Sequence, residues 1–478
     1  MAICSKARRY CMQVNRRAFL AGACAAGAWQ VLSGCFSPRA YRANGKVRLA
    51  AIGVGQQAWY DICRFRKDAG DICELVALCD TDMESGPTLP ALKAYPGLPR
   101  YRDFRKMFDE MADSIDAVLV AIPDFSHFPA AMHAMKLGKA VFVEKPLAHT
   151  FEECELLRLA ARKYGVVTQM GNQGHSTIKY YQFKEYVEKG IVKDVARVNV
   201  HMNMTRRWHK FKGNIFHYPV GEDIPATLDY DTWLGTARFH EYSPEYMRGE
   251  WRCWYDFGNG AIGDWGAHLM DCVHEFLLKG DLPSKIELVK CEGWNQFVFP
   301  CATTVKMSFP ANEKHGDMTL AWYDGAQNLP PLPKGFVYDV PDGIPKNSAN
   351  GDADFNRRQL FPGKEMYQKD GTVWQSLSHK HPLHLVGDFN AKLPDYPPET
   401  DTHYRSFIRA VKGETRTLSP FEVAAPLSQV FCLACVAMRV NRSIAFDLSK
   451  GEIPGDTYAN YFLKGPSPRK GWESYYKI

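Results

Sequence analysis

Hydrophobic and polar positions divide the chain into two parts with different rhythms. In residues 46–172, short apolar runs of strand length alternate with segments whose apolar residues recur at helical spacing. The strand-like runs are 47–54, 75–79, 117–122, 140–143 and 166–170, and the helical segments are 59–67, 103–111, 127–137 and 151–164. Short connections between such elements are typical of a parallel sheet covered by helices on both faces. Residues 46–172 are therefore predicted to form an α/β domain of the Rossmann type, whose ligand-binding loops gather at one edge of the sheet.

The pattern changes after Asn172. Several segments then alternate apolar and polar residues, as half-exposed strands do. A helical segment at about 178–190 is followed by strand-like runs at 196–204, 285–291 and 303–308, and residues 401–440 are helical again. This predicts an α+β domain over residues 173–478 with an open, mainly antiparallel sheet. Residues 324–402 are rich in Pro, Gly, Asn and Asp, so they are expected to be a loop-rich insertion.

The first 35 residues have the pattern of a processed export signal. Five basic residues precede an uncharged stretch from Ala18 to Gly34. Residues 15–20, Asn-Arg-Arg-Ala-Phe-Leu, resemble the twin-arginine signal of bacteria. Leu-Ser-Gly-Cys at 32–35 resembles a lipobox, in which Cys35 is lipidated and anchors the chain to a membrane surface. We expect export by the twin-arginine route to the periplasm, with a linker at 36–45; the alternative is a leader with an incidental cysteine.

Composition limits the classes of partner. The formal net charge of +6 comes largely from the basic residues of the leader, and the nearly neutral body argues against a nucleic-acid partner. No apolar run after Cys35 is expected to span a membrane. The ten cysteines after Cys35 are irregularly spaced and are expected to be buried thiols rather than disulfides. Cys432 and Cys435 lie in an apolar helical run and are predicted to face the core.

Two strand ends carry the pattern of a dinucleotide site. The first strand runs into Gly53-Val54-Gly55-Gln56-Gln57-Ala58, a glycine turn that presents backbone N–H groups and a helix dipole to a pyrophosphate. Asp80 ends the second strand, where its carboxylate can accept hydrogen bonds from ribose hydroxyls and repel a 2′-phosphate. The alternative is that Asp80 caps a turn, as Asp82 could. NAD is therefore predicted in preference to NADP.

Two further strand ends extend this site. Residues 122–127, Ile-Pro-Asp-Phe-Ser-His, close a strand so that Pro123 and His127 can bracket the nicotinamide end, although Ser126 could also simply cap the next helix. Glu144-Lys145-Pro146 follows residues 140–143, which displays Lys145 at the carboxyl edge of the sheet. A lysine there can polarise a substrate hydroxyl beside the nicotinamide. Gln56, Gln57, Glu144 and Asn172 are also expected at the cofactor site.

Glu144-Lys145-Pro146, combined with Gly-Asn-Gly-Ala-Ile-Gly-Asp-Trp-Gly-Ala-His at 258–268, resembles a known family. This is the glucose-fructose oxidoreductase, inositol dehydrogenase and rhizopine-catabolism family, and the resemblance covers the chain from Lys46 to about Asp447. It implies an NAD(P)-binding domain, an open-sheet domain and sugar or polyol substrates. It also implies a catalytic set of Lys145, Asp264 and His268.

Asp264 and His268 are four residues apart, so they share one face of a helix. The carboxylate can orient the imidazole or hold a hydroxyl while His268 accepts the proton. Asp271 lies on the same face, so a metal site formed by Asp264, His268 and Asp271 is an alternative. We predict no metal, because the lysine and the nicotinamide already stabilise the charges that an alcohol oxidation develops. A structural, core role for His268 is the other alternative. At most two of the tryptophans in this half are expected to contact substrate; they are Trp208, Trp233, Trp251, Trp254 and Trp265.

Three functions remain open at the level of sequence. The first is an exported, NAD-dependent oxidoreductase that acts on a secondary hydroxyl of a sugar, glycoside or polyol and keeps its cofactor tightly bound. The second is a redox-neutral glycosidase or epimerase that passes through a keto-sugar. The third is a surface sugar-binding protein without chemistry. An open sheet face also favours a homo-oligomer.

Overall fold

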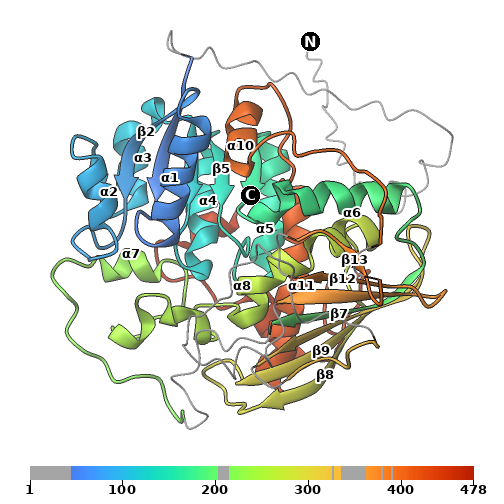
Figure 1. Cartoon of the computed structure of the whole chain (residues 1–478). Helices are drawn as coiled ribbons and strands as arrows, with labels where there is room; N and C mark the ends of the chain where they lie inside the picture. Colours follow the sequence, from blue (N-terminus) through green and yellow to red (C-terminus); the bar gives the residue numbers. More distant parts are fainter. Residues whose placement is uncertain (1–44, 203–214, 326–327, 335–361, 378–380, 389–390) are drawn as a thin grey trace, which may run out of the picture. The chain divides into compact units, whose positions relative to one another are not determined.

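The computed structural model describes residues 45–202, 215–325, 328–334, 362–377, 381–388 and 391–478. The predicted export signal, most of the linker and Trp208 lie outside these residues. The described part holds two sheets, each with its own helical cover (Figure 1). The expected α/β fold, with a parallel sheet followed by a mainly antiparallel one, is confirmed.

The first sheet has six parallel strands in the order β3-β2-β1-β4-β5-β6. Its strands are β1 (Val47–Ile52), β2 (Cys73–Cys79), β3 (Arg100–Tyr101), β4 (Ala117–Val120), β5 (Ala140–Val143) and β6 (Thr168–Met170). The order reverses direction beside β1, which opens a crevice at the carboxyl ends of β1 and β4. The short edge strand β3 is the one strand of this sheet that the pattern of apolar residues did not predict.

Helices cover both faces of the first sheet. They are α1 (Gln57–Ala69), α2 (Leu89–Ala94), α3 (Phe104–Met111), α4 (His127–Lys136) and α5 (Phe151–Tyr164). Buried residues of α1 and α2 pack on one face, and those of α3, α4 and α5 pack on the other. Helix α10 (His403–Val411) returns from the distant part of the chain to the face of α1, where Tyr404 and Phe407 contact Phe65. Residues 403–411 therefore complete the layer around the first sheet.

The second sheet has eight strands in the order β13-β12-β11-β7-β10-β9-β8-β14. Its strands are β7 (Val195–Met202), β8 (Lys285–Glu292), β9 (Ala302–Phe309), β10 (Met318–Asp324), β11 (Gly363–Gln368), β12 (Val373–Leu377), β13 (His384–Leu385) and β14 (Ile444–Ala445). Only β7 and β10 pair in parallel. The expectation of a loop-rich insertion at 324–402 was wrong for β11, β12 and β13. These strands carry buried polar residues, such as Glu365 bound to His201 of β7 at 2.7 Å, so they show no apolar alternation.

The remaining helices join the two sheets. They are α6 (Ile178–Glu188), α7 (Tyr230–Leu234), α8 (Gly260–Leu269), α11 (Phe421–Val440) and α12 (Thr457–Lys464), with a π-helical turn at Val273–Leu277. Among the described residues, α11 alone is long and apolar enough to cross a membrane, and 78% of its 18-residue apolar stretch is buried in the protein. It packs against α5, α8 and β8 as a core helix. Cys432 lies in this core with Cys435 partly buried beside it, and no disulfide joins the ten cysteines that the structure describes.

Candidate active site

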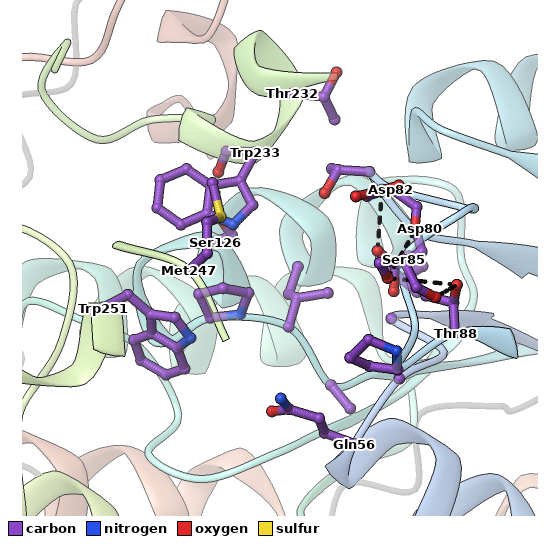
Figure 2. Close-up of a pocket in the computed structure, with 18 of the residues that line it drawn as sticks. Gln56, Asp80, Asp82, Ser85, Thr88, Ser126, Thr232, Trp233, Met247 and Trp251 are labelled. Carbon is purple, nitrogen blue, oxygen red and sulfur yellow. Dashed lines mark hydrogen bonds between the residues drawn. The ribbon is translucent and has the colours of Figure 1, made fainter. Parts of the chain in front are cut away.

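A cavity of about 520 Å³ lies at the carboxyl edge of the first sheet. The ends of β1, β2, β4 and β5 form one wall, and residues between 225 and 252 form the opposite wall. Figure 2 shows Asp80, Asp82, Ser85 and Thr88 on one side and Trp233, Met247 and Trp251 on the other. The volume lies within the range of small-molecule sites, about 300–1,000 Å³.

The glycine turn fits a dinucleotide pyrophosphate. Gly53 has φ +91°, and a Cβ atom there would lie 2.2 Å from the carbonyl oxygen of Ala121, so no side chain fits at this position. Gln56 precedes α1 without a side-chain cap on the helix, and the first turn of α1 has no acidic residue. The backbone N–H groups and the positive end of α1 therefore remain available to an anion.

Asp80 stabilises the same turn from the end of β2. Its carboxylate accepts hydrogen bonds from the backbone N–H of Val54 at 3.0 Å and of Asp82 at 3.3 Å. Burial raises the pKa of Asp80 to about 6, against these hydrogen bonds, which lower it. Each carboxylate oxygen keeps a second lone pair, so Asp80 can also accept hydrogen bonds from ribose hydroxyls.

Lys145 connects the first sheet to α8. Its Nζ donates hydrogen bonds to Asp264 Oδ1 at 2.7 Å and to the Asp264 carbonyl oxygen at 3.0 Å. Arg252, from the 3₁₀ turn Glu250–Cys253, places Nε 3.6 Å from the same Oδ1. The side chains of Lys145 and Asp264 are only 11% and 5% exposed, so this ion pair is largely screened from solvent. An ammonium group has three donors, and the third remains for a ligand.

A second buried carboxyl lies close to this ion pair. Asp124 follows β4 and is 2% exposed, and its Oδ2 accepts a hydrogen bond from the backbone of Asn259 at 3.3 Å. Burial raises the pKa of Asp124 to about 6, although the positive charges of Arg252 and Lys145 oppose this. From the sequence, Asp124 was considered only as part of residues 122–127. An acidic residue next to Pro123 at a strand end is the feature that could have identified it.

Glu144 lines the cavity and forms a buried pair with Asp61 of α1. Burial raises the pKa of Glu144 to about 7, and burial together with the charge of Glu144 raises that of Asp61. Gln173 donates to Glu144 Oε1 at 3.0 Å, and Tyr404 donates to Asp61 Oδ1 at 2.7 Å. At least one of the two carboxyl groups is therefore expected to keep its proton up to about neutral pH.

The structure places most of the predicted cofactor residues along the cavity. They are Gly53, Gly55, Gln56, Gln57, Asp80, Pro123, His127, Glu144 and Lys145. Both ring nitrogens of His127 lie 2.8 Å from backbone carbonyls, those of Ile122 and Pro146, and burial lowers its pKa to about 4. A neutral imidazole carries one N–H, so in this form His127 donates to only one of the two carbonyl oxygens and helps to fix one strand end.

Asn172 is the exception among these cofactor residues. It is fully buried, is not among the residues that line the cavity, and donates to Asp271 Oδ1 at 3.1 Å. Asp271 also binds His175 Nδ1 at 2.8 Å. The chain turns inward after β6, and the Asn172 amide binds the buried Asp271–His175 ion pair there. A role for Asn172 at the cofactor stays a prediction.

His268 lies one helical turn after Asp264 on α8, as predicted. It is 9% exposed, its ring contacts that of Trp265, and it is not among the residues that line the cavity. Its role as a base stays a prediction. Within the described residues, no group of three or more His, Cys, Asp or Glu side chains is arranged to hold a metal ion.

Several cavity residues were not assigned from the sequence, chiefly Arg248, Arg252 and Met247. They come from turns without periodicity, although Arg252 lies only a few residues before the 258–268 motif. Of the tryptophans considered, Trp233 and Trp251 line the cavity, as does Trp472 of the C-terminal segment. Trp254 is buried elsewhere and Trp265 does not line the cavity.

Two family models match the chain. A model described as an oxidoreductase family with an NAD-binding Rossmann fold matches residues 47–172, and one described as the C-terminal alpha/beta domain of that oxidoreductase family matches residues 176–313. Together they cover more than half of the chain. The protein belongs to the glucose-fructose oxidoreductase, inositol dehydrogenase and rhizopine-catabolism family. Within this oxidoreductase family, the first sheet is the NAD-binding domain, as the sequence predicted.

Curated relatives in this oxidoreductase family are distant. D-xylose 1-dehydrogenase [NADP(+)] of Haloarcula marismortui is 27% identical over 195 residues, which cover 40% of this chain and 48% of the relative. Inositol 2-dehydrogenase/D-chiro-inositol 3-dehydrogenase of Lactiplantibacillus plantarum is 24% identical over 209 residues, 42% of this chain and 57% of the relative. The chain thus spans about half the length of these relatives.

Solved structures share the fold. The WlbA dehydrogenase of Chromobacterium violaceum, in complex with NADH and UDP-GlcNAcA, has a TM-score of 0.56 at 14% identity and covers 84% of this chain and 97% of its own. The WlbA dehydrogenase of Bordetella pertussis has a TM-score of 0.55 at 15% identity, with coverage of 84% and 99%.

Proposed function

We propose that the protein is an NAD-dependent oxidoreductase that removes hydride from a secondary hydroxyl of a sugar, glycoside or polyol. The observation that carries the proposal is the Lys145–Asp264 pair, with its Nζ–Oδ1 distance of 2.7 Å, at the cavity that also contains the glycine turn. The dehydrogenases of xylose and inositol among the relatives support a carbohydrate substrate.

NAD, when bound, supplies the hydride acceptor. Asp264 fixes the ammonium group of Lys145 by two hydrogen bonds, so the remaining N–H of Lys145 can bind the substrate hydroxyl oxygen and stabilise the negative charge that develops there. His268 is proposed as the proton acceptor. The flat faces of Trp233 and Trp251 suit the apolar C–H face of a sugar ring.

The test is mass spectrometry of the small molecules released when the purified protein is denatured, followed by a screen of glycosides for keto products. Bound NAD and a keto product support the proposal. Loss of turnover in Lys145→Met, with NAD binding retained, would assign Lys145 to the chemical step. A pH–rate profile of His268→Gln that keeps the wild-type acidic limb would exclude His268 as the base.

A redox-neutral glycosidase is the second candidate. A glycosyl hydrolase family 109 protein of Shewanella pealeana is 34% identical over 113 residues, which cover 23% of this chain and 24% of the relative. In such a cycle the hydride taken from the sugar returns to it after elimination, so no NADH accumulates. Glycoside cleavage without NADH or keto product would favour this candidate. A protein that binds sugars, carries no dinucleotide and is unaffected by Lys145→Met would be a binding protein without chemistry.

We also propose that the protein is exported by the twin-arginine route and anchored through Cys35, on the basis of residues 15–20 and 32–35. The twin-arginine route exports proteins that are already folded, so NAD bound during folding would be carried out with the protein and kept through many turnovers. The test is cell fractionation of Arg16→Lys/Arg17→Lys and Cys35→Ser variants. The proposal of a homo-oligomer is tested by light scattering of the purified protein.

A further inference from the structure

Two guanidinium groups line the same end of the cavity, and neither donates a hydrogen bond to another described residue. Arg252 is 16% exposed in its side chain, lies over the ring of Trp251 at 4.2 Å, and has Asp264 as its ion-pair partner at 3.6 Å. Arg248 is exposed at the rim. A largely buried guanidinium with its donors unused is costly unless a ligand supplies acceptors.

The backbone at Arg248 is also unusual. Arg248 has φ +56° and Gly249 has φ +94°, so two consecutive residues adopt the left-handed conformation. This conformation is uncommon for a residue with a side chain and persists where surrounding structure imposes it, frequently at ligand sites. The turn presents Arg248 on the same wall of the cavity as Arg252.

Charge is distributed unevenly along the cavity. Asp80, Asp82 and Glu84 lie near the glycine turn, where a dinucleotide carries its ribose and pyrophosphate. At the opposite end, Lys145, Arg248 and Arg252 line the cavity together with Glu144, and the buried carboxyl groups of Asp124 and Asp264 lie close to Lys145 and Arg252. Three of the cations that line the cavity therefore gather at the substrate end. A planar guanidinium that is already held against an aromatic ring suits bidentate binding of a carboxylate.

We propose that the substrate is an acidic sugar of the uronate type, whose carboxylate is held by Arg252 and Arg248. This inference rests on the proposed oxidoreductase function and specifies its substrate class. Arg252 and Arg248 act as specificity-determining residues, while Lys145 binds the reacting hydroxyl on the same ring.

The test compares matched neutral and acidic sugars on the full protein loaded with NADH. The probes are the methyl β-pyranosides of glucose, galactose and mannose and the three corresponding methyl pyranosiduronates, with dissociation constants from titration calorimetry. At least one uronate is expected to bind roughly ten- to a hundredfold more tightly than its neutral counterpart, as for a charge-assisted hydrogen-bonded pair. Arg252→Gln should abolish this ratio, Arg252→Lys should retain part of it, and Arg248→Gln should reduce it.

Arg102→Gln is the matched control, because Arg102 lines the other end of the same cavity and lies 3.4 Å from Glu84. It should leave the uronate preference unchanged. NADH affinity and melting temperature, measured for every variant, show whether a loss reflects the cofactor or the fold. If Arg252→Gln weakens NADH binding and leaves the uronate ratio intact, the arginines serve the cofactor phosphates and the proposal is wrong.

The proposal is also overturned if no uronate binds more than threefold better than its neutral partner. Failure of the proposed function has a different signature. In that case a uronate still binds through Arg252, but no sugar of the set reduces NAD or yields a keto product.

Discussion

Replacing Lys145 by methionine removes the cation that binds Asp264, while keeping a long flexible side chain in place. The Asp264 side chain is only 5% exposed, so its charge is then largely buried without the lysine. Arg252 is the cation that remains beside it, with Nε 3.6 Å from Oδ1. Breaking a buried ion pair on one side costs about 3–5 kcal/mol. Because Arg252 retains part of the attraction, we expect Lys145→Met to lower the free energy of unfolding by about 3 kcal/mol.

The double variant Lys145→Met/Asp264→Asn separates stability from chemistry. It removes the uncompensated charge, so urea unfolding of the protein without cofactor should return to within about 1 kcal/mol of the wild type. The turnover number should stay reduced by roughly a hundredfold to ten-thousandfold in both variants, since the donor to the substrate hydroxyl is absent. Lys67→Met, on the exposed last turn of α1, is the control and should change stability by no more than about 0.5 kcal/mol.

Two results would refute this reasoning. Wild-type turnover in Lys145→Met would remove the lysine from the chemical step. Equal instability of the single and double variants would mean that the Asp264 carboxylate is not left uncompensated when the ammonium is removed.

Two further predictions concern carboxyl groups around the cavity. Asp80→Asn should weaken NAD binding roughly tenfold and reduce the preference for NAD over NADP, because the amide accepts fewer hydrogen bonds and no longer repels a 2′-phosphate. Equilibrium binding of NAD and of NADP measures both effects. An unchanged ratio of the two affinities would contradict the role given to Asp80. The raised pKa values of Asp61 and of Glu144, the latter to about 7, mean that the folded protein keeps a proton that the unfolded chain releases at lower pH. The stability from this proton is complete below the unfolded carboxyl pKa of about 4 and is lost as pH rises through about 7. The melting temperature of Asp61→Asn should therefore fall less steeply than that of the wild type between about pH 4 and about pH 7. Parallel curves would contradict a proton retained by this pair.

Local signals explain which elements the sequence predicts well. Helix α5 has the predicted bounds, because Thr150 forms a capping box with Glu153 and Gly165 ends the helix in the left-handed conformation. Strand β5 is also as predicted, since four buried apolar residues stand between a turn and the Glu-Lys-Pro motif. In contrast, β11 depends on pairing with β7, which is far away in sequence, and its Lys364 and Glu365 are buried through partners that local periodicity cannot reveal.

The same distinction applies to the site. Gly53, Asp80 and Lys145 follow strand ends, so the topology of a parallel sheet brings them to one edge. Arg252 reaches this edge from a 3₁₀ turn of the second half, and Asn172 turns away from it to bind Asp271. These placements depend on packing between distant segments, which a single sequence does not encode in its periodicity.

The central claim is that the cavity holds a nicotinamide dinucleotide between the glycine turn and the wall that carries Trp233 and Trp251. Energy transfer from tryptophan to the dihydronicotinamide of added NADH tests it most directly. We expect quenched tryptophan emission and sensitised NADH emission, both reversed by excess NAD and both reduced in Trp251→Phe. Absence of energy transfer at saturating NADH, or transfer that Trp233→Phe and Trp251→Phe together leave unchanged, would contradict it.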